Sequence, residues 1–317
     1  MAQVGKQFGI SAALQESMCL AGQGYVFEEG ELLFKRLLGI SVNARQIQRV
    51  SEHYGKVAEQ QTNKEIEAGE KSIKPESVES RTFIMVDGSM LYTREEGWKE
   101  MKLGRLFTED ERLQLSPSRT GVVQSQYVCH FGSHDTFVSK MELYADHCPQ
   151  KVFIADGAKW IWKWVCDTYP EAIQILDYYH AVEKLCAFAQ YQYPQESERH
   201  QWVDMQKDRL WANEVFAIIN TLKLITPKND FAKKTLEDLL RYYEANQQRM
   251  QYKTYRESGL LVGSGPIESA HRNVLQQRLK LSGQRWSIDG AQAIANLRAF
   301  NKSNLWEKIT TLIKNAA

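Results

Sequence analysis

The sequence contains no run of apolar residues long enough to cross a membrane. A membrane-spanning helix needs about 18 or more consecutive apolar residues, and the segment WIWKWV at 160–165 is too short and contains a lysine. The N-terminal segment MAQVGKQFGISAAL lacks the apolar stretch and the small-residue cleavage site of a secretion signal. We therefore expect a cytoplasmic protein without a membrane partner.

Cysteine is scarce, and its spacing argues against two kinds of scaffold. The chain has 5 cysteines, which are widely separated and form no CxxC pair. An odd number of scattered cysteines argues against a disulfide framework, and the missing CxxC argues against a zinc ribbon. We expect them to be buried, reduced thiols: Cys19, Cys129, Cys148, Cys166 and Cys186.

An excess of charge of one sign is also missing. The 40 Lys and Arg residues nearly balance the 39 Asp and Glu residues, which leaves a formal net charge of +1. This balance excludes no partner, because nucleic-acid binding depends on local basic patches rather than on the total charge. With 317 residues, 43% of apolar type, the chain is long enough for more than one domain.

Residues 10–62 have apolar side chains at three- and four-residue spacing, which predicts three helices. Gly39 ends the second helix, and Asn43 is expected to cap the third. Such a pair resembles a helix-turn-helix, whose second helix enters the major groove of double-stranded DNA. The alternative is a helical hairpin with a solvated basic face. The side chains that would contact DNA are Arg45, Gln46 and Arg49.

The segments that follow predict strands and then alternating helices and strands. TFIMV, WKEMKLGRLF and VVQSQYVCHF read as an antiparallel meander, and KVFIAD and AIQILD as later parallel strands of the same sheet. This order is that of an RNase H-like fold. We therefore expect an α/β protein with an RNase H-like mixed sheet flanked by helices, an N-terminal helix-turn-helix-like domain and an all-helical insertion.

Changes in composition divide the expected fold into four parts. The polar segment at 60–80 predicts a linker or the frayed end of a helix, and the stretch after residue 190 is rich in Gln, Glu, Lys and Arg at helical spacing. The predicted parts are the helix-turn-helix-like domain and linker at 1–75, the first part of the core at 76–190, the helical insertion at 191–255, and the last part of the core at 256–317.

Two of the predicted strands end in the dipeptide Asp-Gly, at Asp87 and Asp156. The first and fourth strands of an RNase H-like sheet are neighbours, so these two carboxylates are expected to come together. Glu268 follows Pro266 in the first turn of a predicted helix and faces the same edge of the sheet. Each acid alone is more often a turn or helix-end residue. Their expected convergence is what predicts a metal site.

Three carboxylates without a histidine cluster favour Mg²⁺ or Mn²⁺ over zinc. We expect two ions, with Asp87 bridging both and with Asp156 and Glu268 each completing one. Two such ions can hold a phosphodiester from both sides, so that the protein supplies position and charge.

Two further groups of residues accompany the carboxylates. Asp177 and His180 form a DxxH sequence that is expected to hydrogen-bond at the start of a helix. The segment from Ser269 to Trp286 carries four cations and no acid, which suits a DNA-binding edge. The alternatives are a capping Asp and a solvated basic helix with a tryptophan in the core. The residues of this edge are Arg272, Arg278, Lys280, Arg285 and Trp286.

Four motifs in order, VDGSMLYTREEGWKEMKLGRLF, VFIADGAKWIWKWV, ILDYYHAVEKL and GLLVGSGPIESAHRNVLQQRLKLSGQRWSIDGAQAIANLRAF, resemble the DDE transposases of ISKra-type insertion sequences, relatives of the Mutator-like group. The resemblance implies an RNase H-like catalytic domain with a helical insertion. It maps the catalytic acids onto Asp87, Asp156 and Glu268. A DxxH recurs in related transposases, which implies an accessory role for Asp177 and His180.

The resemblance also implies which partners the protein has, and it raises an alternative to the catalytic function. Transposases act on double-stranded DNA, at element ends and at a target, and commonly as homo-oligomers. The cytoplasmic protein is then expected to be associated with the nucleoid when it is bound to DNA. Members of the family carry additional sequence before the segment that matches residues 10–30, so this copy is expected to be shortened at its N-terminus. The alternative is then a catalytically silent DNA-binding relic or regulator of transposition. A two-carboxylate glycosidase is a third, remote reading, because the strand order and the basic helix favour DNA.

Overall fold

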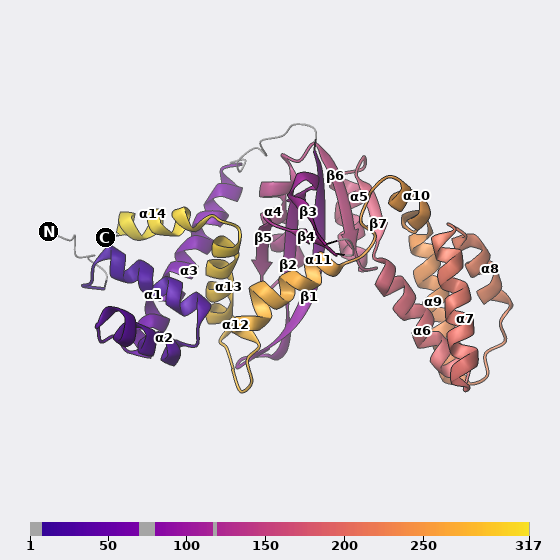
Figure 1. Cartoon of the computed structure of the whole chain (residues 1–317), viewed down its shortest axis with the longest axis horizontal. Helices are drawn as coiled ribbons and strands as arrows, with labels where there is room; N and C mark the ends of the chain where they lie inside the picture. The colour runs from indigo at the N-terminus through magenta and orange to yellow at the C-terminus, as the bar shows by residue number, and fades with distance from the viewer. Residues whose placement is uncertain (1–7, 70–79, 117–118, 317) are drawn as a thin grey trace. The chain divides into compact units, whose positions relative to one another are not determined.

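A computed structural model of the chain describes residues 8–69, 80–116 and 119–316 (Figure 1). The larger of its two sheets is mixed, with five strands in the order β5-β2-β1-β6-β7, and helices flank it. The predicted class of an α/β protein with a mixed sheet is therefore confirmed. Contacts divide the chain into two units, the first made of residues 1–150 and 267–317 and the second of residues 151–266.

The first unit begins with helices α1 (Ala12–Gly24), α2 (Phe27–Leu33) and α3 (Ala44–Glu67). A π-helical turn, η1 (Phe34–Leu38), extends α2 and ends at Gly39, whose φ of 65° suits glycine. Asn43 caps α3 as predicted: its side chain accepts a hydrogen bond from the backbone of Gln46, and the Gln46 side chain accepts one in return. The three predicted helices are confirmed.

Strands β1 (Arg81–Thr93), β2 (Gly97–Thr108) and β5 (Gln126–His130) form the antiparallel part of the sheet, as the sequence predicts. The polar connection between β2 and β5 contains structure that the sequence pattern did not indicate. A 3-10 turn, η2 (Glu109–Glu111), precedes a small hairpin of β3 (Arg112–Ser116) and β4 (Arg119–Val122).

Helices cover the antiparallel strands closely. Helix α4 (His134–Ala145) packs on β2 and β5, and α13 (Ile288–Lys302) packs on β5 and along α3 (Figure 1). The approach of α13 to α3 requires Gly55, because a Cβ there would lie 2.2 Å from the carbonyl oxygen of Ala293. Because α13 joins α3 to the sheet, the N-terminal helices and the C-terminal segment belong to the same unit.

The C-terminal segment begins with a continuous helical stretch that carries the third predicted acid. It consists of α11 (Gly265–Ala270), the π-helical turn η4 (His271–Gln276) and α12 (Gln277–Leu279). The last helix of the chain is α14 (Trp306–Ala316), which packs on α1, α3 and α13.

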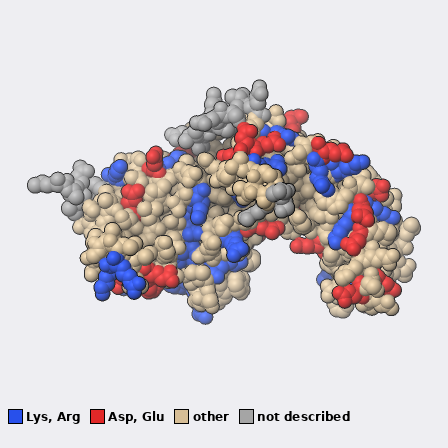
Figure 2. All heavy atoms as spheres, viewed as in Figure 1, with Lys and Arg blue, Asp and Glu red and all other residues tan. Residues whose placement is uncertain are grey.

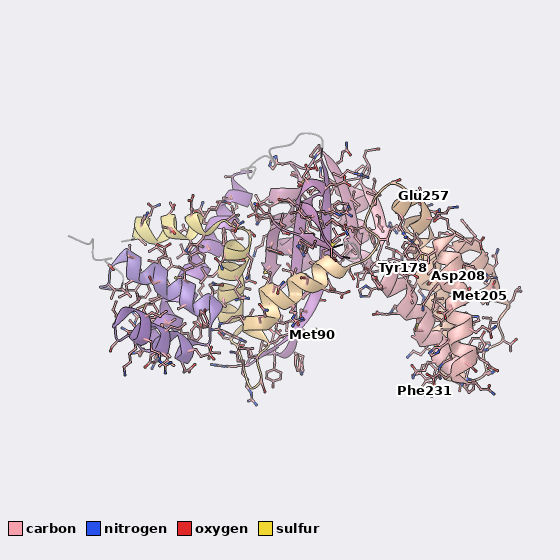
Figure 3. All side chains as sticks on the ribbon, in the orientation of Figure 1. Met90, Tyr178, Met205, Asp208, Phe231 and Glu257 are labelled. Carbon is pink, nitrogen blue, oxygen red and sulfur yellow. The ribbon has the colours of Figure 1, made fainter. Side chains whose placement is uncertain are left out.

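The second unit contains the parallel strands β6 (Gln150–Ala155) and β7 (Ile173–Leu176), joined by α5 (Lys159–Thr168). Residues 191–255 are all described and contain no strand, as predicted. Their packing is aromatic: Tyr178, at the start of α6 (Figure 3), stacks on Trp211 with ring centroids 4.2 Å apart. The remaining helices are α6 (Tyr178–Gln192), α7 (Glu196–Trp211), α8 (Val215–Leu224), α9 (Asp230–Asn246), η3 (Gln247–Arg249) and α10 (Tyr252–Glu257).

Three minor predictions have different outcomes. Of the segment 60–80, residues 60–67 belong to the end of α3, which agrees with the helix-end alternative, and residues 70–79 lie outside the described residues. All five cysteines are free, but Cys166 and Cys186 are exposed rather than buried. Among the described residues, no helix is both long enough and apolar enough to span a membrane.

Candidate functional site

Asp87 lies in the middle of strand β1. The strand continues to Thr93, and Asp87 faces Leu103 of β2 in the antiparallel register. The prediction that Asp87 closes the first strand is wrong, because the hairpin turns later, next to Gly97, whose φ of 70° suits glycine. The five residues before Asp87 are buried, whereas buried and exposed residues alternate after it. Asp87 therefore lies where β1 leaves the core, and its carboxylate is partly exposed.

The imidazole of His271 packs against the Asp87 carboxylate. Its Nε2 lies 3.2 Å from Asp87 Oδ2, and the residue is 4% exposed. Neither ring nitrogen makes a hydrogen bond of regular geometry with a described residue. Glu268 precedes His271 by three positions and so lies on the same face of the helical stretch. The start of this helical stretch, which carries Glu268, therefore lies against Asp87 through His271, in one corner of the first unit.

The donor atoms of this corner suit a hard divalent cation. Asp87 Oδ1 accepts a hydrogen bond of 2.7 Å from the backbone nitrogen of Gly88, and Oδ2 faces His271. Carboxylate oxygens are the ligands that Mg²⁺ and Mn²⁺ prefer, and a histidine behind a ligating carboxylate orients it. Asp87 is the acid of this corner, and Glu268 lies on the helix that precedes His271. Among the residues that the structure describes, no three His, Cys, Asp or Glu side chains are grouped as metal ligands.

Asp156 directly follows strand β6 in the second unit, as predicted. Its Oδ1 accepts a hydrogen bond of 2.9 Å from the backbone nitrogen of Ala158, and its backbone oxygen accepts one of 2.7 Å from the indole of Trp162. A Cβ at Gly157 would lie 2.1 Å from the ring of Tyr242, so only glycine fits there without moving that ring. These contacts fix the position of the Asp156 side chain at the carboxyl end of β6.

Asp177 and His180 form the hydrogen-bonded pair that their spacing predicts. Asp177 is fully buried and caps α6: its Oδ1 accepts a hydrogen bond of 2.8 Å from the backbone of His180 and lies 3.2 Å from Nδ1 of that ring. Burial opposes ionisation of Asp177, but the hydrogen bonds from His180 and Ser264 outweigh it and lower the pKa of this carboxyl. The structure supports the capping role and the pairing together.

The same contacts raise the pKa of His180 to about 9. The hydrogen bond to Asp177 is the largest cause, burial acts against it, and the carboxylates of Glu183 and Asp156 contribute further. His180 is therefore an imidazolium at neutral pH. Within the second unit, a fixed positive charge lies near the Asp156 carboxylate.

The basic segment after Glu268 divides into exposed and buried cations. Arg272, Lys280 and Arg285 are exposed, and Lys280 Nζ donates a hydrogen bond of 3.2 Å to Ser89 Oγ, two residues after Asp87. Lys and Arg side chains gather over α12 and the adjoining part of the β1–β2 hairpin (Figure 2), near the exposed Met90 of β1 (Figure 3). These exposed cations suit contacts with DNA phosphates.

Arg278 and Trp286 do not lie on this exposed surface. Arg278 is 1% exposed, and its guanidinium lies over the rings of Phe27 and Trp286, at 4.6 and 4.9 Å from their centroids. Its Nε donates a hydrogen bond of 3.0 Å to the backbone oxygen of Gly22. A phosphate contact at the molecular surface is therefore wrong for Arg278, because its side chain is buried against these two rings. Trp286 is 7% exposed and packs in the core, which was the alternative reading.

The first turns of α3 border a groove of about 480 Å³. Arg45 and Arg49 are exposed there, and Lys56 lies farther along the same helix. The Gln46 side chain is exposed as well, but its Oε1 is committed to the cap at Asn43. The groove therefore presents cations on the helix that the sequence indicates as a DNA reader.

His271 is the residue of this site that the sequence analysis missed. A single histidine in the sequence ESAHR carries no spacing signal. The one available clue was its position three residues after Glu268, on the same helical face. No profile of a known protein family matches the chain, and no curated protein matches it.

Proposed function

We propose that this protein is the DDE transposase of an insertion sequence, an enzyme that cleaves DNA strands at the element ends and transfers them in a divalent-metal-dependent reaction. The observation that carries the proposal is the corner where Asp87 of β1 meets the helical stretch of Glu268 through His271. Asp156, at the carboxyl end of β6, is the third acid of the set.

An RNase H-like core is part of the proposal. Its support is the strand order β5-β2-β1-β6-β7, in which the strand of Asp87 is central, with antiparallel pairing of β1 and β2 and parallel pairing of β6 and β7. The helical residues 191–255 precede the last acid, where the transposase resemblance places an insertion.

Each residue of the proposed active site has a defined task. Asp87, Asp156 and Glu268 would hold Mg²⁺ or Mn²⁺, and two such ions, when bound, would polarise the scissile phosphodiester from both sides. His271 keeps the Asp87 carboxylate in one orientation. The imidazolium of His180, which Asp177 holds in place, contacts the anionic scissile strand.

DNA recognition is assigned to the exposed cations of the first unit. Arg45 and Arg49 on α3 approach the double-stranded DNA of the element ends, while Arg272, Lys280 and Arg285 contact phosphates. Contacts of this kind make binding weaken steeply as salt increases. Because strand transfer joins two element ends to one target, the proposed working form on DNA is a homo-oligomer.

The experiment is a strand-cleavage assay with the full chain and DNA that flanks its own gene, in Mg²⁺, Mn²⁺, Ca²⁺ or a chelator. The proposal predicts nicked and strand-transfer products in Mg²⁺ and Mn²⁺ and none with the chelator. End-specific binding without cleavage in any metal would contradict it and would indicate the catalytically silent regulator.

A further inference from the structure

A second cavity of the first unit lies between the start of α2 and the loop that connects α12 to α13. Its volume is about 260 Å³, and it does not include Asp87, Glu268 or His271. Aromatic, cationic and amide side chains line it: Phe27, Arg94, Arg278, Gln284, Arg285 and Trp286.

Three buried polar atoms of this lining lack a hydrogen-bond partner among the described residues. They are the indole Nε1 of Trp286, the Nη2 of Arg278 and the Oε1 of Gln284. Trp286 and Arg278 are more than nine-tenths buried. A buried polar atom without a partner costs about 1–3 kcal/mol, so a ligand that paired with these two donors and one acceptor would gain free energy. Gln284 is only partly buried, so of the three side chains it is the one that can move without disturbing the core.

The volume of the cavity and the charges of its lining indicate which kind of ligand fits. Since one water takes about 30 Å³, the cavity corresponds to roughly nine waters, which suits a planar ring of about ten heavy atoms better than a single phosphate. The carboxylates of Glu28 and Glu52 also line the cavity and disfavour an anion inside it. Arg94 and Arg285 are exposed, so their charges remain available for phosphates outside.

The cavity adjoins the groove of α3. Gln48 and Glu52 line both, and Gln48 Nε2 donates a hydrogen bond of 2.8 Å to Glu52 Oε1. A DNA strand that follows the cations of α3 would therefore reach the mouth of the cavity. A base edge that carries both acceptors and donors matches a lining of this mixed kind.

We propose that this cavity binds one unpaired base of a DNA strand, and that Gln284 turns as the base enters, so that Trp286 and Arg278 donate hydrogen bonds to the acceptors of the base and Gln284 accepts one from its amino group. Taking a base out of the stack costs a few kcal/mol in a duplex and least where the base has no partner. The inference rests on the proposed function for the identity of the ligand as DNA, but not on its catalytic step.

The test compares three duplexes of equal length: fully paired, with one bulged cytosine, and with the same bulge lacking its base. Cytosine offers two acceptors, a ring nitrogen and a carbonyl oxygen, and one amino donor, which match the three unpartnered atoms. Binding by the full chain is measured by fluorescence anisotropy with a chelator present. We expect the cytosine bulge to bind about tenfold more tightly than the bulge without a base, the equivalent of one good hydrogen-bonded contact.

Two variants assign this preference to the cavity. Trp286→Phe keeps a ring beside Arg278 but removes the donor, and Gln284→Ala removes the acceptor from a partly exposed position. Each variant removes one of the three proposed hydrogen bonds, so both are expected to lower the ratio of affinities. The control, Arg45→Ala, is expected to weaken binding of all three duplexes by a similar factor and to keep the ratio.

Equal binding of the two bulged duplexes by the parent chain would overturn the inference, and so would a preference that both cavity variants retain. Because the assay contains no divalent metal, its outcome is separate from that of the cleavage assay. A chain that cleaves DNA without a base preference refutes the base pocket alone. A chain that prefers the base and does not cleave refutes the catalytic proposal alone.

Discussion

The Nε2 atom of His271 lies 3.2 Å from Oδ2 of Asp87 and joins the C-terminal helical stretch to the middle of β1. The imidazole is buried, whereas the carboxylate is partly exposed. The ring therefore lies on the side of the carboxylate that faces the core and limits its rotation. We regard His271 as a positioning residue for Asp87. Removal of a group that orients a metal ligand without touching the metal commonly weakens metal binding by about 10–100-fold.

His271→Ala is therefore expected to weaken Mn²⁺ binding by about 10–100-fold while the chain stays folded. Isothermal titration of the DNA-bound chain with Mn²⁺ measures this, and circular dichroism checks the fold. His271→Gln, which can still place an N–H near Asp87, is expected to recover part of the affinity. Gln277→Ala, an exposed change on the same helical stretch, serves as the control. Unchanged Mn²⁺ affinity in His271→Ala would show that His271 only fills space.

The Asp177–His180 pair predicts a pH-dependent contribution to stability. Folding raises the pKa of His180 from 6.5 to about 9, so the folded state favours the protonated ring. This stabilisation is complete below pH 6.5 and is lost as the pH rises through 9. His180→Asn should therefore lower the melting temperature more at pH 6 than at pH 9.5. His200→Asn, at an exposed histidine of α7, should lower it equally little at both. A His180→Asn effect that grows with pH would contradict the assignment.

Lys140 is a buried cation that joins α4 to α3. Its Nζ contacts Glu59 Oε1 and donates a hydrogen bond of 3.1 Å to His130 Nδ1. Burial, followed by the charge of Lys140, lowers the pKa of His130 to about 4, so this ring is a neutral acceptor. Lys140→Met leaves the Glu59 carboxylate without its cation and is expected to destabilise the fold by about 3 kcal/mol in urea unfolding.

The double variant Lys140→Met with Glu59→Gln removes both charges and should recover most of that loss. Lys163→Met breaks an ion pair on the surface of α5 and should leave stability unchanged. If Lys140→Met were as harmless as Lys163→Met, the buried pair would have no role in holding α4 against α3.

The close packing of α3 on α13 at Gly55 leads to a further prediction. The added Cβ of Gly55→Ala would meet the backbone of Ala293 at 2.2 Å, and backbone cannot move aside as a flexible side chain can. We expect a loss of about 1–3 kcal/mol in urea unfolding. The matched change Gly24→Ala at the end of α1 meets nothing within 4 Å and should be neutral or slightly stabilising. Equal stability of the two variants would mean that α3 and α13 pack less closely than described.

Much of the fold was predictable because its signals are local. The cap at Asn43, the left-handed Gly39 and the strand end before Asp156 each depend on a few neighbouring residues, and all three occur as predicted. Asp87 shows where local reasoning fails. Asp-Gly is a common turn dipeptide, but here cross-strand pairing with β2 continues past it, and the hairpin turns only near Gly97.

The site residues were less predictable because their roles depend on distant parts of the chain. The buried state of Arg278 follows from the rings of Phe27 and Trp286, and no spacing in the basic segment indicates that α2 would cover it. His271 likewise gains its position from Asp87, which precedes it by 184 positions (271 − 87 = 184). In contrast, Asp177 and His180 are three residues apart on a helix start, so their pairing could be predicted.

Cleavage of DNA by single carboxylate variants tests the central claim most directly. The parent chain and the variants Asp87→Asn, Asp156→Asn and Glu268→Gln are compared in Mg²⁺ on DNA that flanks the chain's own gene. Asp167→Asn, an exposed acid of α5, is the control. We predict that each of the three variants folds and binds DNA but yields no cleaved product, while the control cleaves as the parent does. Full cleavage by any one of the three would contradict its place in the metal site.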